Sequence, residues 1–262
     1  YKKNETKDIF TLIYVFNTGT ENDPALNLAF NYLSYLGTDK MTAEEIASEI
    51  YDIACSFYMN AGANQSSIQI TGLSENMGKA MEIVEGLIAG AKPDEAILEN
   101  LKGDMLKSRA DAKLNQSRCL GALQRYLFYG GDFIRRTTLT DPALQALTSE
   151  QLLAKIGDLT GKQHEVLYYG PQKETEIKSA LAEHHKVAAD LQPLEKKFSA
   201  LLPTDANKVV LAQYDAKQLY YLQFSNRGEK FDVAADPEIT LYNEYFGGGM
   251  NAVVFEEMRE AR

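Results

Sequence analysis

The sequence predicts an α+β fold in which helices cover one face of a β-sheet. A run of alternating character, IFTLIYVFNTG at residues 9–19, is typical of a largely buried strand. Capped helices and a hairpin follow it in blocks rather than in strict β-α alternation. With 262 residues, 45% of them hydrophobic and 24% charged, the chain can bury a sizeable core.

The first helices are predicted from their start signals. Asp23 and Pro24 occupy the N-cap and first-turn positions of a helix that we expect to reach residue 36. Thr42 and Glu45 form a capping box that begins a second helix, ending near Cys55. Short β-like runs at residues 56–63 and 66–71 then predict a hairpin through Asn64 and Gln65, before a helix at residues 77–91.

The rest of the first unit follows the same rules. Lys92-Pro93 ends the preceding helix, and helices are expected at residues 94–114, 116–129 and, after the Thr148 cap, up to about residue 159. A strand at residues 164–169 precedes Gly170-Pro171. Residues 1–170 are therefore predicted to form one complete α+β unit.

A helical linker and a partial second unit are predicted beyond residue 170. Residues 171–204 are charged, and a helix at residues 174–186 should turn Ile177, Ala180 and Leu181 toward the first unit. Within residues 205–262 we expect strands at 209–213 and 218–226, then helices at 237–246 and from 251 onward. This stretch is too short to repeat the first unit, so it is interpreted as the start of a truncated second α+β unit.

Charge and composition exclude some partners. The net charge of −10 disfavours nucleic acid or an anionic membrane, and suits basic or neutral peptides better. The sequence contains no run of 18 apolar residues, so no membrane-spanning helix is predicted. The chain begins at Tyr1 rather than Met, so we expect its natural N-terminus to be missing and draw nothing from the lack of a targeting signal.

The cysteines and histidines give no metal-site pattern. Cys55 and Cys119 are far apart, which favours two buried thiols over a disulfide. His184 and His185 are adjacent and point different ways on a helix, while His164 stands alone before an apolar run. All three histidines are interpreted as surface or structural residues.

The segment LAFNYLSYLGT, residues 28–38, resembles a zinc helix that has lost its ligands. In the pitrilysin or insulinase family, the inverted zincins, an H-x-x-E-H helix runs into an aromatic residue and a Gly-Thr pair. Counting back from Gly37-Thr38 places the ligand positions at Leu28 and Tyr32 and the general base at Asn31. None of the three can do the chemistry of the catalytic zinc site, since Leu28 offers zinc no lone pair. Alternatively, they are simply part of a core helix.

The segment YNEYFGGGMNAVVFEEMREAR, residues 242–262, resembles the glycine loop and helix of the non-catalytic half of that family. Gly247, Gly248 and Gly249 would then form a substrate-facing loop, or alternatively a tight turn between helices. Arg259 falls on the position of an arginine that reaches the scissile carbonyl, whose tyrosine partner would lie beyond Arg262. Alternatively, Arg259 is one charge on a solvated helix face.

The resemblance covers nearly the whole chain and implies a function. Family members are two halves, each of two α+β units, that close around a peptide. The chain is thus identified as the C-terminal, zinc-free half of a peptide-degrading zinc endopeptidase, closing the substrate chamber, supplying substrate-binding groups and inactive alone. No cofactor is expected in this chain, and zinc is expected in the N-terminal half.

The implied partners are an N-terminal catalytic half of the same polypeptide, or a separate catalytic subunit, and a peptide substrate. The alternative is a non-catalytic scaffold or partner subunit of a processing or respiratory-type complex. The resemblance favours a periplasmic or other extracytoplasmic compartment.

Overall fold

The computed structural model describes residues 1–195, 197–226, 228 and 232–260, except for the side chains of residues 259 and 260. The chain divides into two compact units. The first contains residues 1–200 and 210–222, and the second contains residues 201–209 and 223–262.

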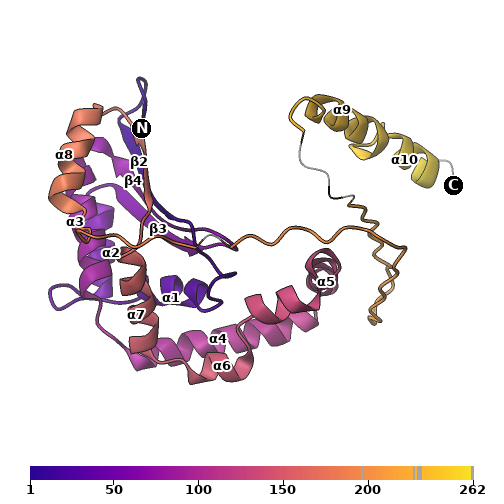
Figure 1. The fold of residues 1–262 in the computed structure, drawn as a ribbon, viewed down its shortest axis with the longest axis horizontal. Coiled ribbons are helices and arrows are strands. Elements are labelled where there is room, and N and C mark those ends of the chain that lie inside the picture. The colour runs from indigo at the N-terminus through magenta and orange to yellow at the C-terminus, as the bar shows by residue number, and fades with distance from the viewer. Residues whose placement is uncertain (196, 227, 229–231, 261–262) are drawn as a thin grey trace. The chain divides into compact units, whose positions relative to one another are not determined.

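The first unit is built on a five-stranded sheet with the strand order β1-β5-β2-β4-β3 (Figure 1). Strands β1 and β5 are parallel, whereas the other neighbouring pairs are antiparallel. In the central strand, Leu12 lies opposite Ile70 of β4 and Tyr168 of β5. The strands are β1 (Lys2–Lys3), β2 (Ile9–Phe16), β3 (Cys55–Ala61), β4 (Ser66–Leu73) and β5 (Glu165–Gly170).

Helices cover one face of this sheet, as predicted. Every second residue of β2, from Phe10 to Phe16, is buried beneath them, and the intervening residues are partly or largely exposed. Figure 1 shows α3 and α8 side by side on this face, with α1, α2 and α7 around them. These helices are α1 (Leu26–Leu33), α2 (Ala43–Asp52), α3 (Met77–Gly90, after the 3₁₀ turn η1, Ser74–Asn76), α7 (Ser149–Thr160) and α8 (Glu174–His184).

The first predicted local signals hold, apart from the start of α1. The Thr42–Glu45 capping box is formed in both directions, and the Gly62 N–H donates to the Gln65 carbonyl to close the β3–β4 hairpin. Helix α1 begins at Leu26 rather than at Pro24. Asp23 Oδ1 accepts the Ala25 N–H instead of capping the helix, because its side chain closes a local turn just ahead of it.

Helix α5 consists of two helical stretches on either side of a glycine kink. The helix predicted over residues 116–129 ends there, because Gly130 has the non-helical φ of 80°, and a second helical stretch that was not predicted follows it; α5 (Gln116–Thr137) contains both. A short helix that the sequence reasoning missed, α6 (Asp141–Ala146), follows with Thr140 as its N-cap. Helix α4 (Glu95–Lys113) agrees with the prediction, and its N-cap is Asp94.

The predicted strands at residues 209–213 and 218–226 are absent from the part of the chain that the structure describes. The Thr204 N–H donates to the Asn226 carbonyl at 2.7 Å and closes the base of this segment. Between these two residues, no described stretch pairs with a strand of the sheet. A β-like sequence becomes a strand only when a neighbour satisfies its backbone hydrogen bonds, so propensity alone was insufficient here.

The linker helix α8 packs on the first unit. Ile177 is buried, and Ala180 and Leu181 pack against the core, as the predicted apolar stripe requires. The second unit contains α9 (Asp236–Gly247), α10 (Val253–Phe255) and the π-helical turn η2 (Glu256–Glu260). Both cysteines are free; Cys55 is buried, whereas Cys119 is only partly buried.

Candidate functional site

The degenerate zinc-site positions lie on α1, and two of the three are core residues. Leu28 is 2% exposed and Tyr32 is fully buried, whereas Asn31 is exposed on the outer face of the helix. These side chains therefore do not converge on one point where a metal could sit.

Tyr32 has a hydrogen-bonding role in this core. Its hydroxyl accepts the Asp94 N–H at 2.7 Å and donates to the Asp94 carbonyl at 3.1 Å. Asp94 in turn caps α4, because its carboxylate accepts the Ile97 N–H at 3.0 Å. The tyrosine at the second ligand position thus ties α1 to the start of α4.

The chemistry of α1 follows from these contacts. A Leu side chain offers no lone pair, and the Tyr32 oxygen is engaged with the backbone. The Asn31 amide is not a base at neutral pH. Within the described ranges, no three His, Cys, Asp or Glu side chains are grouped closely enough to hold a metal ion.

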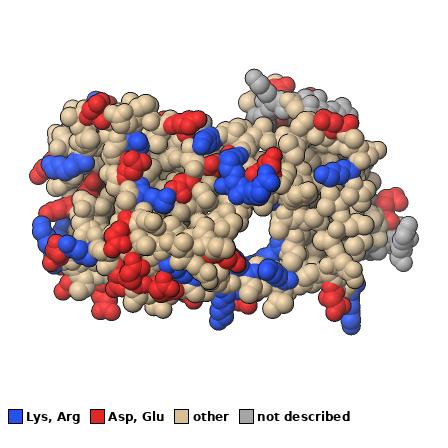
Figure 2. All heavy atoms as spheres, turned by 60° about the horizontal axis from the view of Figure 1, so that its bottom comes forward, with Lys and Arg blue, Asp and Glu red and all other residues tan. Residues whose placement is uncertain are grey.

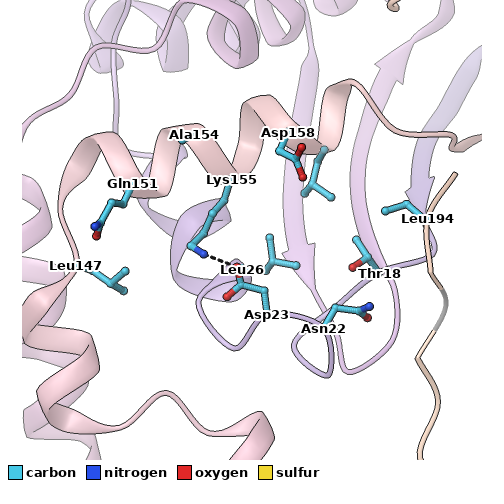
Figure 3. Close-up of a pocket in the computed structure, with 11 residues that line it drawn as sticks. Thr18, Asn22, Asp23, Leu26, Leu147, Gln151, Ala154, Lys155, Asp158 and Leu194 are labelled. Atoms are coloured by element: carbon cyan, nitrogen blue, oxygen red, sulfur yellow. Dashed lines mark hydrogen bonds and ion pairs between the residues drawn. The ribbon is translucent and has the colours of Figure 1, made fainter. Parts of the chain in front are cut away.

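A cavity of about 670 Å³ opens beside the N-terminal end of α1 (Figure 3). Asp23 and Lys155 form an ion pair at its centre, which joins the loop before α1 to α7. Asp158 also faces the cavity, and Leu194, from the segment after α8, lines its edge. The lining can hold a ligand by charge, hydrogen bonds and apolar contact.

Sequence reasoning did not find this cavity. Asp23 was interpreted as a helix cap, and Lys155 lies 132 residues away in the chain. The available signal was a pair of opposite charges beside apolar helix positions, which is too common in sequences to indicate a cavity.

The three glycines lie in the second unit at the end of α9. The Gly248 N–H donates to the Glu244 carbonyl at 3.1 Å, and a Cβ added at Gly248 would lie 2.6 Å from the Glu244 Cα. The φ of Gly248 is −82°, so it is the close approach of the backbone that requires glycine here. Gly247 and Gly249 have open space at their Cβ positions.

The backbone of Arg259 belongs to η2, but its side chain lies outside the described residues. Its proposed contact with a peptide carbonyl therefore stays a prediction. On the face shown in Figure 2, acidic and basic side chains are interspersed rather than gathered into one large patch of a single sign. Among the helices that the structure describes, none is long and apolar enough to cross a membrane.

Solved structures define the class of this fold. An inactive M16 peptidase domain from Pseudomonas fluorescens matches with a TM-score of 0.72 and 16% identity, over 99% of this chain and 64% of that chain. A protease from Helicobacter pylori matches with a TM-score of 0.67 and 13% identity, over 99% of this chain and 65% of that one. The chain therefore has the fold of the pitrilysin-type, or M16, peptidases, which confirms the predicted resemblance.

A third match is the periplasmic protease PqqL from Escherichia coli, with a TM-score of 0.60 and 12% identity. It covers 77% of this chain but only 22% of the PqqL chain, so this chain spans less than a quarter of that protease. At these identities the likeness is one of fold. No protein-family model matches the sequence, and no curated protein matches it.

Proposed function

We propose that this chain is a zinc-free half of an M16-type zinc endopeptidase, which closes the substrate chamber and is inactive alone. The observation that carries the proposal is the state of α1. Its two ligand positions are filled by Leu28 and Tyr32, which are packed into the core. The match to an inactive M16 peptidase domain over 99% of this chain supports the same assignment.

The proposal requires a catalytic partner. That partner is an N-terminal half of the same polypeptide or a separate subunit, and it carries the intact H-x-x-E-H helix and the zinc. Peptides are the proposed substrates. A periplasmic or other extracytoplasmic compartment is proposed because PqqL, which is similar in fold, is a periplasmic protease.

Metal analysis and peptidase assays test the proposal in two steps. The purified chain should contain no stoichiometric zinc and should cleave no peptide of a mixed fluorogenic library. Adding a catalytic partner with an intact H-x-x-E-H helix should then produce cleavage that neither protein gives alone. The matched control is the same partner with the glutamate of that motif replaced by glutamine.

Two outcomes contradict the proposal. One tightly bound zinc in the isolated chain, with cleavage abolished by chelation, would place a catalytic site within it. A partner that cleaves equally well without this chain would instead support the scaffold alternative.

A further inference from the structure

Two of the three histidines, His164 and His185, are in contact although 21 residues separate them. His164 precedes β5, and His185 directly follows α8. Their Nε2 atoms are 2.8 Å apart, and His185 Nδ1 lies 2.5 Å from Glu85 Oε1 of α3. Tyr14 of β2 stacks on the His185 ring with 4.4 Å between ring centroids.

The hydrogen-bond partners determine which ring nitrogens of His164 and His185 carry protons. The Lys162 carbonyl can only accept, so His164 Nδ1, at 2.8 Å, carries a proton and donates to it. His164 Nε2 is then the acceptor of a neutral ring, and His185 Nε2 donates to it. One further proton must lie between His185 Nδ1 and Glu85 Oε1, because a lone pair facing a carboxylate would be repulsive.

The three side chains therefore satisfy one another in a single proton state with no net charge. A proton added to the histidine pair would have to occupy His164 Nε2 and would point at the Nε2–H of His185. A removed proton would leave His185 neutral, so that either its contact with Glu85 or its bond to His164 is lost. Either change breaks a partly buried hydrogen bond.

Other titratable groups lie close to Glu85, His185 and His164. Burial first, and then the nearby Glu85 carboxylate, raise the pKa of the Tyr14 hydroxyl above its ordinary range, so Tyr14 stays neutral. Lys162 pairs with Asp158, the Glu183 carboxylate lies 3.9 Å from His184 Nε2, and the Lys186 ammonium donates to the Glu183 backbone carbonyl. Tyr14 stacks on His185, and Glu82, Glu183, His184 and Lys186 line the same pocket as Glu85. Lys162 and Glu165 flank His164 closely in the sequence.

His185 is also the first residue of a segment held on the first unit, residues 185–195, which we call the strap. The Gln192 N–H donates to the Gly161 carbonyl at 3.0 Å, and the Gln163 N–H donates to the Gln192 carbonyl at 2.8 Å. Asn22 Nδ2 donates to the Glu195 carbonyl at 2.9 Å. Leu194 of the strap lines the cavity beside α1, so the position of the strap sets how open that cavity is.

We propose that the Glu85–His185–His164 chain is a proton-controlled latch, which holds the strap on the first unit only within an intermediate pH range. Below that range the second protonation of the histidine pair releases the strap, and above it loss of the shared proton does the same. The latch thereby couples pH to the access of ligands to the cavity. This inference rests on the first unit alone and is independent of the proposed function.

Amide hydrogen exchange of the whole 262-residue chain tests the latch. Protection factors of the Gln163 and Gln192 amides, which already remove the intrinsic pH dependence of exchange, should peak near neutral pH. They should fall about tenfold or more toward about pH 4.5 and about pH 9.5, as loss of a charged hydrogen bond predicts. Amides of the β2–β4 ladder around Leu12 and Ile70 report whether the core stays folded.

Two variants test the loss of amide protection at acid pH and at alkaline pH separately. In Glu85→Gln the amide donates permanently to His185 Nδ1, so the alkaline fall should vanish while the acid fall remains. In His164→Gln the amide oxygen still accepts from His185 but cannot take a second proton, so only the acid fall should vanish. His184→Gln is the matched control and should keep both falls.

A wild-type profile that is flat over this range would overturn the proposal. So would Glu85→Gln and His184→Gln profiles that are identical. If the ladder amides show that Glu85→Gln does not fold, persistence of the acid fall in His164→Gln would by itself overturn the latch.

Discussion

At the residue scale, Tyr32 occupies a degenerate zinc-ligand position and is a buried, hydrogen-bonded core residue. Its hydroxyl satisfies both the N–H and the carbonyl of Asp94. In Tyr32→Phe the ring still fills the core, but both backbone groups lose their partner. We expect the free energy of unfolding to fall by about 1–3 kcal/mol, measured by urea denaturation, with the zinc content unchanged.

The control for this variant is Tyr35→Phe on the same segment. Tyr35 is 53% exposed, so its loss of a hydroxyl should change the stability by less than about 0.5 kcal/mol. Equal stabilities of the two variants would show that the contacts of Tyr32 with Asp94 contribute nothing, and would leave its burial as the only structural role.

At the element scale, α5 offers two glycines whose substitution should have opposite effects. Gly130 has a φ of 80° at the kink, a conformation that is strained for alanine. Gly121 lies in the helical part of α5, with nothing within 4 Å of its Cβ position. Gly130→Ala should destabilise the chain by about 1–3 kcal/mol, whereas Gly121→Ala should stabilise it by about 0.5–1 kcal/mol.

Thermal unfolding followed by circular dichroism measures both effects. The two variants add the same methyl group to the same helix, so helix propensity alone would raise the melting temperature in both. A higher melting temperature for Gly130→Ala would mean that α5 straightens through residue 130 and that the kink is not required by the packing.

At the scale of the whole molecule, Arg259 can be tested only in an assembled, active peptidase. If its guanidinium reaches the scissile carbonyl, its charge matters most when that oxygen becomes anionic. Arg259→Ala should therefore lower kcat by a factor of about 10² or more while changing KM less. Arg259→Lys should recover only part of the activity, because an ammonium lacks the planar fork.

Zinc content and melting temperature are the controls for Arg259→Ala. Both should stay near the wild-type values, because the proposal places the metal in the catalytic half. Full activity of the alanine variant would leave Arg259 as a solvated helix charge. The proposal that this chain closes the substrate chamber would then lose its only named catalytic group.

The sequence by itself determined the elements whose causes are local. Four features were predicted, because each depends on residues a few positions apart. They are the alternation of β2, the Thr42–Glu45 capping box, the β3–β4 hairpin and the first part of α5. The α+β class followed from their order. The replacement of the zinc ligands was also visible in the sequence, since Leu28 cannot bind a metal in any fold.

Only the tertiary structure decided which of these residues meet. Glu85 and His185 are 100 residues apart, and Tyr32 and Asp94 are 62 apart, so no local pattern indicates either contact. Residues 209–213 have the composition of a strand, yet the described chain gives them no strand to pair with. Side-chain burial, shared protons and strand pairing depend on neighbours brought together by folding, and the sequence specifies those neighbours only through the whole chain at once.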